Sequence, residues 1–344
     1  MAMTRRGRFA STAGIVVIVA ALVVGVLALT GKGPAAQLAQ KVIHHDPPRC
    51  PLTGRLAPHG AIPDRSALAV KVENLPASRP QSGLNEADIV YEEPVEAGIT
   101  RFIAIYQCTD APRVEPVRSA RLEDPDLVRQ FGHALFAHAG GVPKVSARLH
   151  AAHLIDMNFI QYANLFHRDP ARYAPHNLYT STADLWKAAP GKTDVPQPLF
   201  TYERSQPTTG RSISWMHLPF SDYSDVYWRW NAKHAVWLRY HGTVPHLLSN
   251  GAQVRAKNVV VQVVKVTMSS IHDVNGVASP FAHVVGHGKA YILRNGHMVV
   301  GTWSRTSLDD ITVYKDKQGN VIPLTPGNTW VELYPSTLPV TFGH

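Results

Sequence analysis

Residues 79–107 read RPQSGLNEADIVYEEPVEAGITRFIAIYQ, and residues 116–121 read PVRSAR. The first stretch contains two short runs rich in β-branched and aromatic residues, 88–91 and 100–106, with turn-forming residues between them. This pattern predicts two strands. Charged side chains are denser here than a packed core requires, because charged residues are almost never fully buried unless they are paired. We therefore expect a functional site built on a sheet.

Strands and short helices alternate on both sides of this stretch. Residues 68–73 (LAVKVE) and 134–139 predict strands. Asp124 stands before a proline, which is typical of a helix start. Ser181 and Asp184 form a capping box ahead of another short helix. The first half of the chain therefore predicts a mixed α/β domain.

The second half has a different pattern. Residues 226–230 and 236–240 alternate between apolar and polar positions and predict a hairpin, and 259–266 is an apolar strand. Asn295 and Gly296 are the preferred pair for a two-residue type I′ turn. This half predicts a mostly antiparallel β domain, so the fold class of the whole chain is α+β.

The length and composition fit two domains. The chain has 344 residues, 45% hydrophobic and 17% charged, and domains average roughly 150 residues. The predicted order is a basic tail at 1–12, an apolar membrane segment at 13–30, a linker at 31–49, an α/β domain at 50–190, a linker at 191–212 and a β-rich domain at 213–340.

The net charge of +9 does not indicate nucleic-acid binding. The first 50 residues hold six basic residues and one acidic residue, which leaves +4 for the other 294. No run of lysine or arginine provides the electrostatic footprint that a phosphate backbone requires. We therefore expect no nucleic-acid partner.

The basic residues at the start of the chain point to a membrane instead. Arg5, Arg6 and Arg8 precede residues 13–29, which carry no charge. Arginines before an apolar stretch orient it with its C-terminal side outward. We expect a single-pass protein in the cell membrane with the bulk of the chain extracytoplasmic, or a secreted protein if residues 26–28 form a signal-peptide cleavage motif. The first alternative is favoured, although the segment is short for a span.

The chain has two cysteines, Cys50 and Cys108. An exported compartment permits oxidation, so we expect a disulfide between them, with two buried thiols as the alternative. A disulfide between residues 50 and 108 would stabilise the fold by roughly 4 kcal/mol, because it reduces the conformational entropy of the unfolded chain.

The strongest chemical signal is PVRSAR. In a turn or at the start of a helix, Arg118 and Arg121 would face the same way on either side of Ser119, with Arg101 as a further cation. Convergent arginines bind a carboxylate or phosphate through planar, bidentate hydrogen bonds. The equally weighted alternative is that each arginine pairs with a nearby acid, as surface arginines commonly do.

A second anion-binding signal is HAGGVPK at residues 138–144. A strand that ends at His138 and turns through Gly140 and Gly141 into a helix can direct free N–H groups at an anion. Two glycines are also found in plain tight turns, which is the favoured interpretation when this loop is considered alone. Beside Arg118 and Arg121, the two signals would combine into one anion pocket.

His176 is the best candidate for acid–base chemistry. It lies beside Asn177 in a polar loop, and Glu73 or Glu96 could be its carboxylate partner. The alternative is that His176 and Asn177 hold the loop by hydrogen bonds to the backbone. Ser119 is not in a nucleophile elbow.

The sequence predicts no metal and no cofactor. The chain has 18 histidines, but it has neither HExxH nor paired-cysteine motifs. The spacing of His283 and His287 falls in a strand, where it does not bring side chains together.

Three motifs resemble the YerB-like family of extracytoplasmic, putative lipoproteins. They are PVRSAR, Pro175-His176-Asn177 and GTWSR at residues 301–305, and the resemblance covers about residues 50–335. It implies an N-terminal and a C-terminal domain of unknown function. Cys50 departs from the lipoprotein pattern because it lies some twenty residues beyond the apolar segment.

The resemblance also draws attention to Arg305, Arg239 and His246 in the second half. These residues would line a cleft between the domains and bind a ligand there. The interpretation that we favour is packing at the end of a sheet.

Three classes of function remain open. The first is a membrane-tethered module that binds an anionic envelope component, such as a wall polymer or a peptidoglycan fragment. The second is an envelope hydrolase or transferase with His176 as acid or base and arginines that hold the substrate's charge. The third is a structural module that docks a membrane protein. Binding ranks first because no complete set of nucleophile, base and orienting group is evident.

Overall fold

The computed structural model describes residues 46–189, 194–205, 208–272 and 276–344. Within these ranges, the chain from Pro48 to His344 forms one compact unit. The predicted basic tail and membrane segment lie outside the described residues. No helix in the described ranges is long and apolar enough to cross a membrane.

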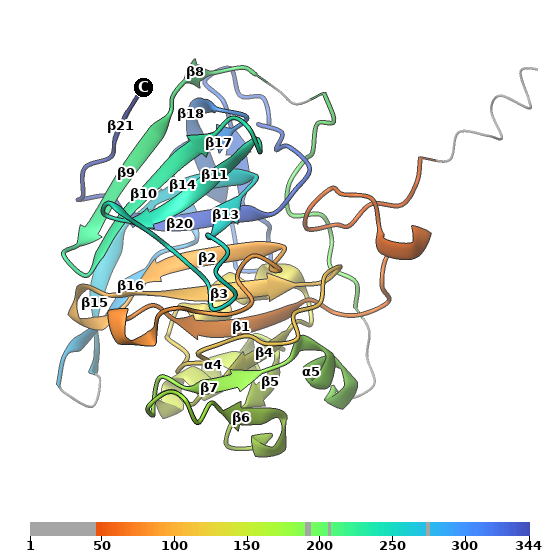
Figure 1. The fold of residues 1–344 in the computed structure, drawn as a ribbon, viewed down its shortest axis with the longest axis vertical. Coiled ribbons are helices and arrows are strands. Elements are labelled where there is room, and N and C mark those ends of the chain that lie inside the picture. Colours follow the sequence, from red (N-terminus) through yellow and green to blue (C-terminus); the bar gives the residue numbers. More distant parts are fainter. Residues whose placement is uncertain (1–45, 190–193, 206–207, 273–275) are drawn as a thin grey trace, which may run out of the picture. The chain divides into compact units, whose positions relative to one another are not determined.

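A large mixed sheet forms the centre of the fold (Figure 1). The described part of this sheet has 11 strands. In spatial order they are β19 (Val313–Lys315), β18 (His297–Arg305), β17 (Gly286–Arg294), β14 (Asn258–Val264), β20 (Thr329–Pro335), β2 (Ile89–Pro94), β3 (Thr100–Tyr106), β1 (Leu68–Glu73), β4 (Leu135–His138) and β5 (Ile155–Asn158), with β8 (Arg211–Ser212) paired to β18.

Three smaller sheets complete the described β structure. The six-stranded sheet contains β9 (Trp215–Ser221), β10 (Ser224–Asn231), β11 (Val236–His241), β12 (Val244–Pro245), β13 (Arg255–Ala256) and β21 (Thr341–Gly343). The two-stranded sheets are β15 (Val266–His272) with β16 (Ala278–Ala282), and β6 (Phe166–Arg168) with β7 (Leu178–Thr180).

The described helices are few and short. The α-helices are α3 (Asp124–Val128), α4 (Pro143–Ala151) and α5 (Thr182–Ala188), and the 3-10 turns are η1 (Pro58–Gly60), η2 (Pro76–Ser78), η3 (Glu96–Gly98), η4 (Arg129–Phe131) and η5 (Ala163–Leu165). The protein is therefore rich in β structure.

One strand near the C-terminus joins the two halves of the chain. β20 lies between β14 and β2 and pairs in parallel with both. Parallel pairing of this kind connects segments that are distant in sequence. The central sheet therefore runs without interruption from the first half of the chain into the second. The predicted domain boundary at 191–212 stays a prediction.

Two apolar layers cover the central sheet. On one face, Val70 and Phe102 pack in a cluster with Trp228 of the six-stranded sheet. On the other face, Ile103 belongs to a cluster that includes Val128 of α3. Because side chains alternate along a strand, consecutive residues of β1, β2 and β3 enter different layers, and this alternation positions the charged residues described below.

Several local predictions are confirmed. The predicted strands 68–73 and 100–106 have the bounds of β1 and β3. Ser181 caps α5 by accepting a hydrogen bond from the N–H of Asp184. Asn295 and Gly296 both have positive φ, 48° and 73°, as a type I′ turn requires.

Cys50 and Cys108 form the predicted disulfide. These are the two cysteines of the chain. Neither thiol can therefore carry a thioether-linked lipid while the bond is intact.

Candidate functional site

A row of charged residues crosses three adjacent strands near one end of each, in the interior of the central sheet. Arg101 of β3 lies opposite Glu73 of β1 and opposite Glu93 of β2. Both carboxylates have other partners, since Glu93 pairs with the fully buried Lys71 and Glu73 pairs with Arg118 at 2.8 Å. The two acids that flank Arg101 by register are therefore occupied by other cations.

Arg118 and Arg121 approach this row on an extended segment. The N–H of Arg118 donates to the carbonyl of Lys71, and the N–H of Ala139 donates to the carbonyl of Arg118. The segment thus runs between the ends of β1 and β4. The predicted turn or helix start at PVRSAR is wrong, because backbone pairing with two neighbouring strands holds this segment extended.

These residues line a cavity of about 510 Å³. Its charged and polar lining comes from Glu73, Glu96, Arg101, Arg118, Ser119, Arg121, His272 and Ser279. Its apolar lining includes Leu75, Ile99, Leu122, Val142, Val145 and Ile271. A cavity of this size with a few convergent polar groups is typical of a small-molecule site.

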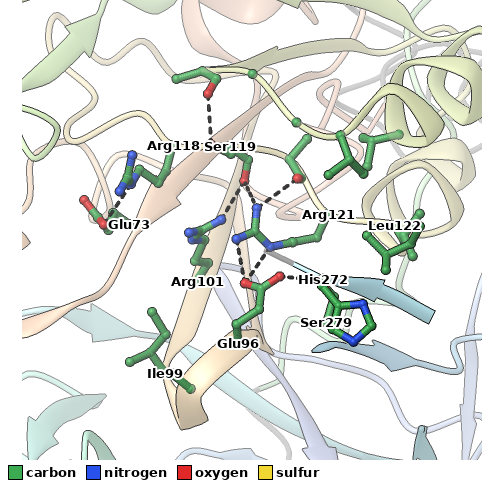
Figure 2. A pocket seen from close by; sticks show the side chains of 18 of the residues that line it. Glu73, Glu96, Ile99, Arg101, Arg118, Ser119, Arg121, Leu122, His272 and Ser279 are labelled. Atoms are coloured by element: carbon green, nitrogen blue, oxygen red, sulfur yellow. Dashed lines mark hydrogen bonds and ion pairs between the residues drawn. The ribbon is translucent and has the colours of Figure 1, made fainter. Parts of the chain in front are cut away.

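Arg121 is held by hydrogen bonds to Glu96, another residue of the cavity lining (Figure 2). Its Nε and Nη2 donate to one oxygen of Glu96 at 2.9 and 2.6 Å, and its Nη1 donates to the carbonyl of Ala120 at 3.1 Å. The hydroxyl of Ser279 donates to the other oxygen of Glu96. Although burial acts to raise it, Arg121 holds the pKa of Glu96 below its ordinary value. Every nitrogen of the Arg121 guanidinium thus has an acceptor.

Arg118 has a different arrangement. Its Nε donates to Glu73 at 2.8 Å, but within the described residues no acceptor takes its Nη1 or Nη2. The side chain is 24% exposed. The end of this guanidinium is therefore available to a ligand in the cavity.

Arg101 is the least satisfied cation of the site. Only 6% of its surface is exposed, and its one hydrogen bond goes from Nη1 to the carbonyl of Ser119 at 2.9 Å. Its buried Nε has no acceptor in the described part of the chain. Burial, together with the charge of Arg121, lowers the pKa of Arg101 to about 9. An anion in the cavity would offset part of this electrostatic cost.

The HAGGVPK segment borders the same cavity. Gly140, Gly141, Val142 and Val145 contribute to its lining, and α4 begins at Pro143. His138 is fully buried, with Nδ1 2.8 Å from the carbonyl of Gly140 and Nε2 2.9 Å from Asp156. Both ring nitrogens therefore fix the shape of the loop, and neither is open to a ligand.

His176 lies at the edge of this network and is not part of the cavity lining. Its Nδ1 is 2.7 Å from Oε2 of Glu73, so Glu73 bridges His176 and Arg118. Asn177 holds its own loop, because its amide donates to the carbonyls of Asp169 and Arg172. The structure thus brings together His176 and Glu73 but places Glu96 with Arg121.

Arg305 does not line this cavity. It is buried, and its guanidinium donates to the carbonyls of Asp126, Leu308 and Asp310. These bonds fix the loop that follows β18. Across the described ranges, no three His, Cys, Asp or Glu side chains lie together in a group that could hold a metal ion.

Some residues of the network had not been predicted. Lys71 and Asp124 form a buried ion pair at 2.8 Å, and burial lowers the pKa of Lys71. The signal was present, since Lys71 interrupts the apolar run of residues 68–72. Ser279 and His272 come from the β15–β16 hairpin, and neither had a local pattern that connected it to the arginines.

A second hollow of about 530 Å³ is lined by Arg79, Arg113, Arg172, Glu115, Asp169, Pro80 and Ser249. Arg113 pairs with both Glu115 and Asp169. Arg172 donates to the carbonyls of Ser78 and Pro80. These partners occupy the cations, so this hollow is the weaker candidate.

Both halves of the chain match domains of one protein family. The family described as "Protein of unknown function (DUF3048) N-terminal domain" matches residues 52–195, and its C-terminal domain matches residues 216–331. The chain belongs to this family, which confirms the predicted resemblance.

A named relative and a solved structure agree with this assignment. The chain is 29% identical to "Putative lipoprotein YerB" of Bacillus subtilis strain 168 over 295 residues, which covers 83% of this chain and 86% of the relative. It also resembles the crystal structure of YerB from Bacillus subtilis, with a TM-score of 0.73 and 26% identity over 86% of this chain and 99% of that one.

Proposed function

We propose that this protein is a membrane-associated extracytoplasmic protein that binds an anionic component of the cell envelope. The cavity beside Arg101 and Arg118 is the proposed binding site. The observation that carries the proposal is the buried Arg101 guanidinium, which lines the cavity and has an Nε without an acceptor among the described residues. A buried cation is costly unless it is paired.

Two observations support the proposed membrane-associated, extracytoplasmic location. The arginines at the start of the chain and the apolar residues 13–29 predict an exported chain with an N-terminal anchor. The relative from Bacillus subtilis is named a putative lipoprotein. In this chain both cysteines are joined in the disulfide, so we propose attachment through the apolar segment.

The three arginines differ in how many of their N–H groups already have acceptors, and this difference suggests which of them would bind the anion. Arg121 is occupied by Glu96 and by carbonyls, so we assign it to the wall of the site. Arg101 and Arg118 retain unused N–H groups, and they would hold the anion. A guanidinium offers five N–H donors in a planar fork, which suits carboxylate and phosphate oxygens.

Calorimetry of the purified full-length protein tests this function. The probes are acetate, D-alanyl-D-alanine, inorganic phosphate and a glycerol phosphate polymer. We expect at least one probe to bind, and Arg101→Met with Arg118→Met to weaken its binding at least tenfold, because charge-assisted hydrogen bonds are about twice as strong as neutral ones.

The matched control is Arg129→Met. The side chain of Arg129 is 25% exposed and paired with Asp309, close to the 24% of Arg118, but it is outside the cavity lining. The control should bind like wild type. An equal loss in the control would mean that the probes respond only to net charge, and no binding by wild type would favour a protein-docking role.

A second candidate function, an envelope hydrolase or transferase, rests on the contact between His176 and Glu73. A carboxylate 2.7 Å from Nδ1 orients an imidazole so that Nε2 can take or give a proton. If the protein turns over a bound envelope fragment, His176→Gln should abolish turnover and leave binding within about twofold. Turnover by this variant at the wild-type rate would remove the catalytic role.

A further inference from the structure

The N-terminus of α4 adds a second group of donors to the proposed site. α4 spans nine residues from Pro143, and Val142 is its N-cap. Gly141 and Val142 line the same cavity as the arginines. The first N–H groups of a helix have no partner within it and carry a partial positive charge.

These amides have no acceptor in the described protein. Neither a side chain nor the backbone accepts from the N–H of Gly141, Val142 or Lys144, and no side chain caps the helix. The first turn of α4 also contains no acidic residue. The cavity is therefore bordered by unused amide donors as well as by the buried, unpartnered Nε of Arg101.

The two groups of donors lie next to each other along the backbone. The N–H of Ala139 donates to the carbonyl of Arg118, and the N–H of Ala120 donates to the carbonyl of Gly140. The extended segment that carries Arg118 is thus paired with the segment that leads into α4. Both groups of donors therefore border the same cavity.

The net charge of the cavity lining indicates which ligand charge the site would balance. Three guanidiniums, from Arg101, Arg118 and Arg121, face two carboxylates, from Glu73 and Glu96. The excess is one positive charge, and a helix N-terminus adds about half a charge. A phosphomonoester, which carries about −1.5 to −2 at pH 7 and has three acceptor oxygens, fits this excess better than a carboxylate with one charge and two oxygens.

Building on the proposed function, we propose that the site is specific for a phosphomonoester, held by Arg101 and Arg118 on one side and by the first amides of α4 on the other. Helix N-termini that follow glycine-rich turns bind phosphate in this manner. The same group occurs in soluble metabolites and in lipid headgroups, and the two sources can be separated by experiment.

One substitution removes a single amide at the start of α4. Val142 has φ −70°, an angle that proline adopts, so Val142→Pro deletes the N–H without changing the backbone angle. Gly141 has no Cβ to clash with the proline ring. Val142→Ala is the matched control, because it shortens the same side chain and keeps the N–H.

Calorimetry of the full-length protein would use glycerol 3-phosphate, dimethyl phosphate and acetate. We expect glycerol 3-phosphate to bind at least tenfold more tightly than the other two. Val142→Pro should bind glycerol 3-phosphate about tenfold more weakly than Val142→Ala does, as expected for one hydrogen bond to a charged group. Vesicles that contain phosphatidic acid form the lipid arm, and the tighter of the two arms identifies the source.

Three results separate the outcomes. Equal affinities of Val142→Pro and Val142→Ala, or of acetate and glycerol 3-phosphate, would overturn phosphomonoester specificity. If acetate binds as tightly as glycerol 3-phosphate and Arg101→Met abolishes the binding of both, the proposed function stands without this specificity. If no anion binds wild type, both proposals fail. Should Val142→Pro not fold, the wild-type comparison of glycerol 3-phosphate with acetate still tests the specificity, because equal affinities overturn it.

Discussion

Glu92 and Glu93 are adjacent in β2 but belong to two different ion networks on opposite faces of the central sheet. On one face, Glu92 accepts from Nη2 of Arg239 at 2.8 Å with both oxygens. On the other face, Glu93 pairs with Lys71 and lies opposite Arg101 in register. Both networks contain an arginine and a glutamate, yet they differ in how far the arginine donors are satisfied.

Arg239 is a fully satisfied arginine. Its Nε and Nη2 donate to Glu92, and its Nη1 is 2.8 Å from Nδ1 of His246 and 3.1 Å from Nε2 of His241. It is completely buried. Arg101 makes one hydrogen bond and lines a cavity. The comparison teaches that unused donors, rather than burial or charge, distinguish Arg101, the proposed binding arginine, from the structural Arg239.

The same contrast explains the second half of the chain. The sequence had suggested Arg239, His246 and Arg305 as cleft residues, with packing as the favoured alternative. All three are buried. Burial, together with the charge of Arg239, lowers the pKa of His246 well below its usual range. These residues hold loops and sheets together.

The largest expected effect comes from breaking the satisfied network. Arg239→Met leaves Glu92 buried beside Glu332 without its cation, and the removal of one partner from a buried ion pair costs roughly 3–5 kcal/mol. Urea unfolding should show this loss in the free energy of unfolding. A loss below about 1 kcal/mol would mean that Arg239 is not a structural residue.

A smaller effect is expected at Glu123, which is buried just before α3. Burial, reinforced by the neighbouring Asp124, raises the pKa of Glu123 to about 8. In the unfolded chain, the carboxyl group of Glu123 ionises near pH 4.5, whereas in the folded protein it keeps its proton up to about pH 8. This contribution to stability is therefore complete below pH 4.5 and is lost between about pH 4.5 and 8.

Glu123→Gln should flatten that pH profile. Glutamine has the same shape and no proton to lose, so we expect the variant to be about 1–3 kcal/mol more stable than wild type at pH 8. Stability measured from pH 5 to pH 8.5 by urea unfolding checks this. Parallel profiles for the two proteins would show that Glu123 titrates normally.

The smallest effect is expected at the unsatisfied arginine. Arg101→Met removes a buried cation that has one hydrogen bond, and apolar replacement of a poorly compensated buried charge is often neutral or stabilising. In anion-free buffer, the free energy of unfolding should change by less than about 1 kcal/mol or increase. A loss as large as that of Arg239→Met would remove the contrast between the two arginines.

Local parts of the fold could be predicted from the sequence, and long-range parts could not. Residues 68–73 and the Asn295–Gly296 turn carry their own pattern, so the strand and the hairpin were predicted. The position of β20 between β14 and β2 was not, because parallel pairing of distant segments leaves no local signal. This pairing brings the two halves of the chain into one sheet.

The residues of the candidate site could be predicted more readily than their roles. Arg118, Arg121, Glu73 and Glu96 were all expected near a site, and the structure places them around one cavity. Which arginine is left with free donors depends on how Lys71 and the three arginines share Glu73, Glu93, Glu96 and Asp124. Arg101 was thus only a further cation in the sequence, and its unpartnered Nε became visible only in three dimensions.

The most direct test is an anomalous difference map from crystals of the protein soaked in tungstate, a tetrahedral oxyanion. The account predicts a peak in the cavity within hydrogen-bonding distance of the Arg101 and Arg118 guanidiniums, and no peak at Arg239. An empty cavity at a tungstate concentration that saturates binding in solution would contradict it.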